Sequence, residues 1–165
     1  MPNEIKTIVP VPAWVDAMQV QTDLRGTADA YTLVPLVYRA LQLRCNSLLR
    51  IPYALYKKGD ETYTEQDWPY PDTPLDDLLW LTQAALLLAG ASYVVKLRNG
   101  IGVSKGLQWL NPFTMRVDYR NGELLFTQQT TPPHTWRAEE IIYTREFNPS
   151  DDIGAGVAAA DVALQ

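Results

Sequence analysis

A strongly apolar helix that stops on a glycine and runs directly into a strand dominates residues 73–95. Within it, residues 78–89 contain only two polar side chains, so the helix is apolar on nearly every side. A helix of that kind is normally buried from several directions. Gly90 supplies the left-handed residue that ends it, and from Tyr93 onward the side chains alternate with the period of a strand. We therefore expect the rest of the chain to pack as layers against this helix and strand.

The start of this helix carries its own sequence signals. Thr73 is a suitable N-cap and Pro74 suits the first helical position. Asp76 stands where a capping-box carboxylate reaches back to the cap, at the positive end of the helix dipole. We expect Thr73, Asp76, Gly90 and Tyr93 to have structural roles.

Length and composition indicate one ordinary globular domain. The chain has 165 residues, of which 47% are hydrophobic and 20% charged. Its net charge of −5 argues against a face that grips nucleic acid tightly. A single cysteine, Cys45, excludes an internal disulfide. We expect no signal peptide, because residues 1–13 carry an acid and three prolines, and no membrane span, because the longest apolar stretch is too short.

The charges fall into blocks along the chain. Residues 31–58 contain five basic side chains and no acid, whereas residues 59–80 contain seven acids and no base. Residues 121–165 are acidic again, with seven acids and two arginines. Two explanations fit such blocks equally well. Either neighbouring layers expose opposite charges to solvent, or complementary flanks join copies of the chain head to tail.

The first half of the chain is expected to hold an arm, a helix and a strand. Residues 1–30 are expected to form an extended N-terminal arm, and residues 31–165 a single domain. A helix is predicted over residues 33–49, capped by Thr32, and a strand over residues 51–58. The apolar stripe of this helix comprises Leu33, Leu36, Val37, Ala40, Leu41, Cys45 and Leu48. Residues 61–72 are predicted to be a polar and aromatic loop.

The second half is expected to form antiparallel hairpins. Asn99-Gly100 and Asn121-Gly122 are strong hairpin signals. The strands predicted around them and after them cover residues 93–98, 107–110, 114–119, 124–127 and 141–144. The predicted class is α+β, an antiparallel β meander packed with two main helices.

A third helix is predicted near the C-terminus. Residues 149–152 look like its start, and Gly154 and Gly156 precede an alanine-rich stretch that is still helical in pattern at Gln165. We expect this helix to be truncated, or completed by something else.

No pattern indicates an enzyme, a metal site or a cofactor. His134 is the only histidine and has no cysteine nearby, so we expect a surface side chain. Paired acids such as Asp76 and Asp77 stand at predicted element starts, where capping and solvation explain them. The glycine pairs lack the lysine and the strand–helix context of a phosphate loop.

The order of the motifs resembles the N-terminal part of a portal protein of tailed bacteriophages, of the siphophage and prophage type. The motifs that carry the resemblance are Ser-Leu-Leu-Arg-Ile-Pro-Tyr-Ala-Leu-Tyr at 47–56, Pro-Asp-Thr-Pro at 71–74, Leu-Leu-Ala-Gly-Ala-Ser-Tyr-Val at 87–94, Leu-Gln-Trp-Leu-Asn-Pro at 107–112, Glu-Ile-Ile-Tyr at 140–143 and Asp-Ile-Gly-Ala-Gly-Val at 152–157. The resemblance covers residues 34–165. The chain departs from the family pattern at Ala91, Tyr143 and Val157.

The resemblance implies a structural role in a virion. A portal is a homo-oligomeric ring, usually of twelve copies, at one capsid vertex; DNA passes through it without sequence-specific binding. It contacts capsid, terminase motor and head–tail adaptor proteins, and is present in the host cytoplasm during assembly. This chain resembles the outer, wing-like part, and the stem, clip and crown segments of the family lie after Gln165. Candidate subunit or partner contacts are Arg39, Arg44, Arg50, Trp68, Tyr70 and Trp136.

Two alternatives remain open from the sequence. The first is a non-catalytic protein-binding module of a phage or host-defence system, which docks partners on an aromatic patch of Trp68, Tyr70 and Trp136. The second is a hydrolase with an unrecognised site that includes Asp76.

Overall fold

Helices and antiparallel strands make up the described chain, which comprises residues 26–58 and 63–163 of a computed structural model. The helical segments are α2 (Thr27–Leu33), α3 (Pro35–Leu48), α4 (Leu75–Ala89), α5 (Ala159–Ala163) and a 3₁₀ turn, η1 (Pro112–Thr114). The strands are β1 (Leu55–Lys58), β2 (Tyr63–Gln66), β3 (Ala91–Arg98), β4 (Ser104–Leu110), β5 (Met115–Arg120), β6 (Glu123–Gln128), β7 (His134–Arg137) and β8 (Ile141–Arg145). The α+β class predicted from the sequence is confirmed.

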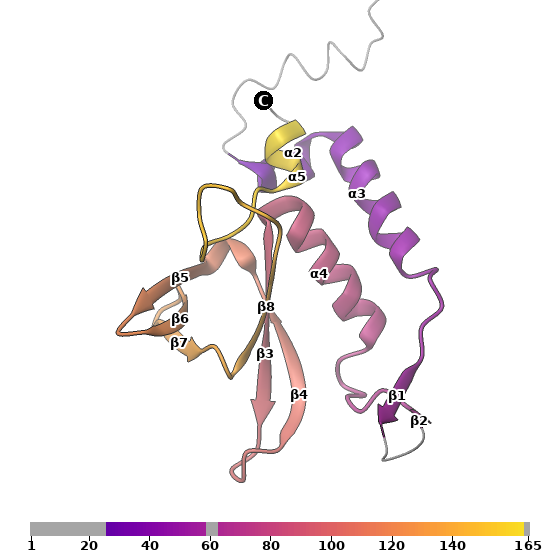
Figure 1. Cartoon of the computed structure of the whole chain (residues 1–165). Coiled ribbons are helices and arrows are strands. Elements are labelled where there is room, and N and C mark those ends of the chain that lie inside the picture. Colours follow the sequence, from indigo (N-terminus) through magenta and orange to yellow (C-terminus); the bar gives the residue numbers. More distant parts are fainter. Residues whose placement is uncertain (1–25, 59–62, 164–165) are drawn as a thin grey trace, which may run out of the picture.

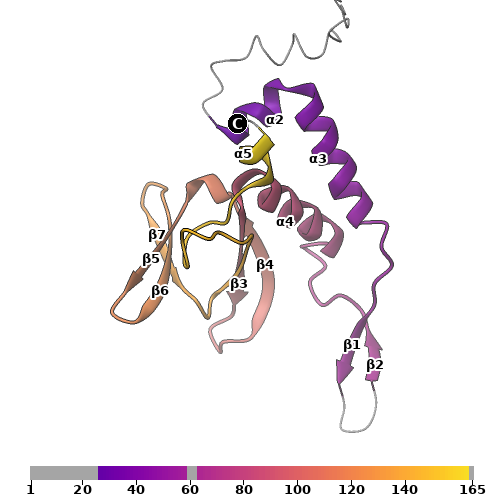
Figure 2. The same ribbon diagram turned by 45° about the horizontal axis from the view of Figure 1, so that its top comes forward.

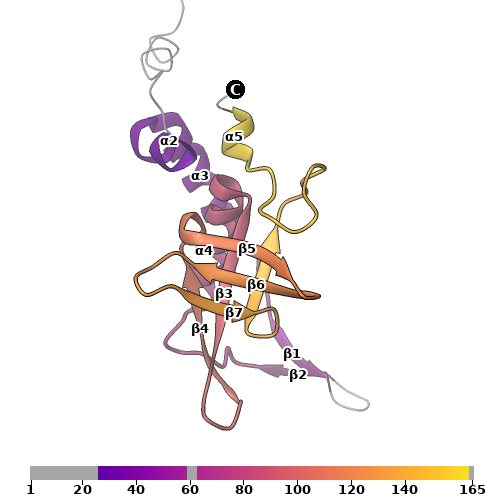
Figure 3. The same cartoon turned by 90° about the vertical axis from the view of Figure 1, so that its left-hand side faces the viewer.

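The strands form two three-stranded sheets and one separate hairpin. The first sheet has the order β4-β3-β8 and the second β5-β6-β7, while β1 pairs only with β2. In Figure 3, β5, β6 and β7 cross the face of the first sheet. The chain therefore does not run as one continuous meander: η1 carries it from the first sheet to the second, and β8 returns to pair with β3.

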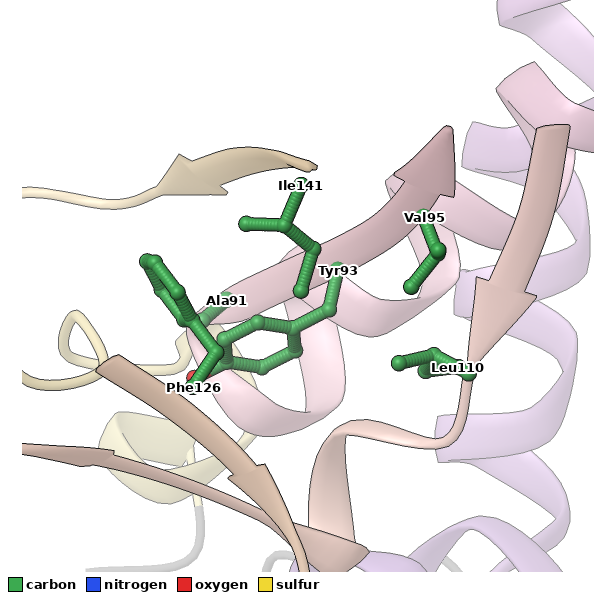
Figure 4. Packing of buried hydrophobic residues seen from close by; sticks show 6 residues of the cluster. All are labelled: Ala91, Tyr93, Val95, Leu110, Phe126 and Ile141. Carbon is green, nitrogen blue, oxygen red and sulfur yellow. The ribbon is translucent and has the colours of Figure 1, made fainter. Parts of the chain in front are cut away.

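Strand β3 is buried on both faces, which places it at the centre of the fold. Tyr93 and Val95 pack toward the second sheet, in a cluster with Phe126 (Figure 4). Val94 points the other way and packs against Leu78 of α4. Helix α3 then covers the far side of α4 through a third cluster, so the layers run α3, α4, first sheet, second sheet (Figure 1).

The apolar character of α4 follows from this position between two layers. Leu78 faces the sheet, whereas Ala84 packs against Leu41 and Cys45 of α3. The small side chains of Ala84 and Ala85 are buried and allow close approach. The prediction that this helix is covered from more than one direction is therefore confirmed.

The start of α4 differs from the predicted cap. The N-cap residue is Pro74, and no side chain caps the helix. The Thr73 hydroxyl instead donates a hydrogen bond to the carbonyl of Leu107 in β4, 2.8 Å away. Asp76 does not form a capping box; its carboxylate accepts a hydrogen bond from the Tyr53 hydroxyl. The capping prediction was wrong because tertiary partners compete for these polar groups.

Gly90 joins three segments of the chain. Its φ of 69° is the left-handed C-cap predicted from the sequence, and its N–H donates to Leu86 at 3.1 Å. Its carbonyl accepts hydrogen bonds from the N–H of Glu146, at 2.9 Å, and of Gly156, at 3.0 Å. A Cβ at Gly90 would overlap the backbone of Gly156, and a Cβ at Gly156 would overlap that of Glu146. Glycine is required at both positions because another segment of backbone lies where a Cβ would be.

The first predicted helix, over residues 33–49, corresponds to α3, which begins only at Pro35, and the helix before it, α2, was not predicted. Residue Val34, which precedes Pro35, has φ −103° and ψ 104°, because proline disfavours the helical conformation of the residue before it. Residues before it form α2, whose Thr27 and Ala30 are buried. Residues 27–30 of the predicted arm are thus part of the folded unit, and residues 1–25 lie outside the described part of the chain. Thr32 does not cap α3; its hydroxyl donates a hydrogen bond to the backbone carbonyl of Asp29, 3.0 Å away.

Two strands were not predicted. Strand β2 occupies part of the predicted loop at 61–72 and pairs with β1, which begins only at Leu55. Strand β7 (His134–Arg137) follows the prolines at 132 and 133, contains Trp136 and pairs with β6. Both are short, and their sequences are too polar to alternate clearly. The turns at Asn99-Gly100 and Asn121-Gly122 are confirmed, the second with φ of 52° and 83°.

The predicted helix start at 149–152 is a loop. The Asp151 carboxylate accepts hydrogen bonds from the N–H of Ile153 and Gly154, at 2.8 and 2.9 Å. Arg145 and Tyr143 of β8 donate to backbone carbonyls of this loop, including that of Gly154 at 3.2 and 2.7 Å. These side chains satisfy backbone groups that a helix would otherwise pair, and α5 begins only at Ala159.

Replacing Gly90 with alanine tests the glycine junction. We expect Gly90→Ala to lower the free energy of unfolding by about 3 kcal/mol or more, because left-handed strain adds to steric overlap. Gly122→Ala is the matched control: it has a φ of 83° but nothing within 4 Å of its Cβ. It is expected to cost about 1 kcal/mol. Urea unfolding measures both, and equal losses would contradict the close-approach role.

Candidate functional site

The described residues contain no group of side chains that could hold a metal ion. No cluster of three or more His, Cys, Asp or Glu residues is present in 26–58 and 63–163. His134 packs on the ring of Trp136, with 4.4 Å between centroids. Cys45 is buried, and burial raises the pKa of its thiol, which reduces the thiolate fraction that reacts.

The titratable groups with shifted pKa values have structural explanations. The hydrogen bond to Asp76 raises the pKa of the Tyr53 hydroxyl. Burial raises the pKa of Tyr93 and of Tyr143, whose rings stack at 5.1 Å. The N–H groups of Gly154 and Ile153 lower the pKa of Asp151. These groups hold loops and packing together, and the hydrogen bond from Tyr53 gives Asp76 a structural partner.

The outer face of α3 exposes both apolar and basic side chains. Leu36 and Leu43 are 53% and 72% exposed, although Leu36 was predicted to lie in the buried stripe. They stand seven positions apart, and Arg39 lies between them on the same face of the helix. A groove of about 510 Å³ runs along this face, lined by Leu36, Arg39, Gln42, Leu43, Asn46 and Arg50. The sequence offered one signal for this face, because Leu43 lies outside the predicted stripe.

The three arginines of the predicted contacts do not share one surface. Arg39 and Arg50 line the α3 groove, whereas Arg44 lines a separate groove of about 230 Å³ between α3, α4 and α5. All three are exposed, and none forms a salt bridge with another residue of the described chain. Arg39 and Arg50 are therefore available cations on an apolar helix face.

The aromatic side chains of the predicted docking patch lie in two different places. Trp68 and Tyr70 contact each other edge to face at 5.3 Å and pack against the α4–sheet cluster. The Trp68 indole donates to the carbonyl of Thr73, at 2.7 Å, and Tyr70 bonds to Ser104. Trp136 packs against the cluster between the two sheets instead. These rings are half-buried packing groups, so they do not form one exposed patch.

Exposed acids lie near the hairpin β1–β2 and the start of α4. Glu65, Asp67, Asp72, Asp76 and Asp77 are all exposed. The α3 face thus carries arginines that form no salt bridge with another described residue, and the segment that follows β1 carries acids. No helix within the described ranges is long and apolar enough to span a membrane.

Comparison with solved structures reveals the same fold in two particle assemblies. One matching chain belongs to the virion of a native gene transfer agent (GTA) particle, with a TM-score of 0.61, 17% identity and 94% of this chain covered. Another belongs to the neck of an empty GTA particle computed with C6 symmetry, with a TM-score of 0.62, 20% identity and 94% coverage. This chain spans 42% and 43% of those two chains, less than half their length. No family model and no curated protein matches the sequence.

Alanine substitutions distinguish packing tryptophans from docking tryptophans. We expect Trp68→Ala and Trp136→Ala each to lower the free energy of unfolding by about 2 kcal/mol or more, because each removes a ring from a packed cluster. Phe147→Ala is the control, since Phe147 is 82% exposed and its loss should change stability by less than about 0.5 kcal/mol. Unchanged thermal and urea unfolding of both tryptophan variants, with loss of a bound partner, would restore the docking-patch hypothesis.

Proposed function

We propose that this chain is a structural subunit of a phage-like particle, and specifically the wing-like part of a portal ring at the capsid vertex. The observation that carries the proposal is the fold shared over 94% of the chain with a component of the GTA neck. The motif order over residues 34–165 supports the same family independently of that comparison. The role is structural and uses no catalytic group or cofactor.

In this proposal the complete protein forms a ring of twelve copies that conducts DNA during packaging and ejection. A twelve-fold ring contains a six-fold axis, which is compatible with the C6 symmetry of the GTA neck. The ring contacts capsid proteins, the terminase motor and a head–tail adaptor. The protein resides in the virion, and in the host cytoplasm while particles assemble.

The charge of the chain supports a conduit. At a net charge of −5 the chain repels phosphate groups on average, so DNA slides past it with little retention. The arginines of α3 do not form one continuous surface: Arg39 and Arg50 line the α3 groove, and Arg44 lines a different groove. A subunit that bound DNA tightly would instead hold it in place.

Particle localisation tests the proposal. An epitope tag on the protein in a producing strain should co-purify with particles and label one vertex, next to the tail, by immunogold electron microscopy. An untagged strain is the control. Absence from purified particles, or label spread over the whole capsid, would contradict a portal role.

Duplex DNA titration gives a second test. We expect the chain to bind DNA no more tightly than about 10 µM at roughly 0.15 M salt, within the ordinary non-specific range. Fluorescence anisotropy with a labelled duplex measures the Kd, and repeating it at low salt controls for weak electrostatic attraction. A submicromolar Kd at the higher salt would be incompatible with a sliding conduit.

A further inference from the structure

Residues 147–163, which follow β8 and include α5, contribute one side chain to the interior of the molecule. Ala158 is 1% exposed, and it is the only buried residue of this segment, all of which the structure describes. Phe147 is 82% exposed, and α5 itself contains no buried residue. In Figures 1 and 2 the segment leaves β8 as a loop, and α5 then lies beside α2. Burial of apolar surface therefore contributes little to its attachment.

The packing of α5 against the other helices is loose. A groove of about 230 Å³ lies between α5, α3 and α4, and the α5 side chains that line it are alanines. Val162, the largest apolar side chain of α5, is 60% exposed. A helix of 5 residues is not stable without support. The position of α5 therefore depends on the residues that precede it.

Two side chains of β8 hold the segment to the first sheet. The Arg145 guanidinium donates three hydrogen bonds, of 2.6 to 3.2 Å, to backbone carbonyls of residues 151–154. The Tyr143 hydroxyl donates to the carbonyl of Gly154, 2.7 Å away. Hydrogen bonds from a charged donor are stronger than those from a neutral one. Arg145 is therefore the principal polar anchor of the segment.

The loop that leads to α5 is fastened at both ends to one atom and is bonded within itself. The Gly90 carbonyl accepts hydrogen bonds from the N–H of Glu146, at 2.9 Å, and of Gly156, at 3.0 Å. Between these points the Asn148 and Asp151 side chains bond to backbone groups of the same loop, over 2.8 to 3.1 Å. These internal bonds do not involve the rest of the chain, so the loop can keep its shape when it separates from the sheet.

We propose that the 147–163 segment detaches from the core and returns as one unit while α3, α4 and both sheets stay folded, and that Arg145 is the positioning residue that holds it closed. Segments with few buried apolar contacts open at a lower free energy than the whole domain. Opening breaks the bonds to Arg145, Tyr143 and Gly90 and uncovers one buried alanine. The segment thus sets where α5 lies relative to the two sheets. This inference does not depend on the portal role.

Amide hydrogen exchange of the full chain, followed by NMR at increasing urea concentrations, tests the independent unit. The amides of Ile153, Gly154 and Gly156 are hydrogen-bonded in the closed segment. They should exchange through openings that hardly depend on urea, because such openings expose little surface. The amides of β3 should exchange only through global unfolding, which depends steeply on urea. Equal rates and equal urea dependence for the two sets overturn the proposal.

Replacing Arg145 with lysine tests the anchor. Lysine keeps the charge but lacks the planar group that reaches several carbonyls at once. We expect Arg145→Lys to speed exchange of the segment amides by about tenfold or more and to leave β3 unchanged. Arg116→Lys is the matched control, because Arg116 bonds to Asp118 on β5, and it should change neither set. An unchanged segment, or an equal rise in β3, overturns the role of Arg145.

A distance measurement shows whether α5 moves with the loop. Spin labels on Val162→Cys and Leu43→Cys report the separation of α5 from α3, and the native Cys45 is buried. Arg145→Lys should add a second, broader population of distances. Leu43→Cys paired with Ile101→Cys, in the β3–β4 turn, is the control and should not change. Faster exchange of the loop with an unchanged α5–α3 distance would mean that the loop frays while α5 stays fixed, and would overturn the single unit.

Discussion

Burial of β3 on both faces is the constraint on which the other layers depend. Alternate side chains of this strand enter two different clusters, one beneath α4 and one beneath the second sheet. Each cluster is shielded from water only by the layer that packs over it. The strand therefore requires a helix on one side and a sheet on the other. The carbonyl of Gly90, immediately before β3, then ties the chain after β8 to the same point. Packing and backbone bonding therefore converge on one junction.

This layered arrangement determines which apolar and basic side chains stay exposed. The apolar faces of the two sheets pack against each other. Helix α4 is covered by β3 and β4 on one side and by α3 on the other. The outer layer, α3, retains an apolar and cationic face, and the β1–β2 hairpin extends from the chain just after it. The hairpin lies near the start of α4, at the opposite end of that helix from Gly90 (Figure 1).

The likeness to the GTA neck and virion chains concerns fold, at 17% and 20% identity. A shared fold does not by itself carry over surface residues or their contacts.

The sequence by itself determined the α4–β3 core, the left-handed Gly90, both asparagine–glycine turns and the α+β class, because each depends on local conformation or on periodic hydrophobicity. Only the tertiary structure decided which hydrogen bonds are formed by polar groups that have several possible partners. Thr73 bonds to β4 instead of capping α4, and Arg145 and Tyr143 hold residues 151–154 out of a helix. The separation of Trp68 from Trp136, and the exposure of Leu36, likewise depend on which layers meet. Local preferences differ by about 1 kcal/mol per residue, so a long-range hydrogen bond of similar strength reverses them.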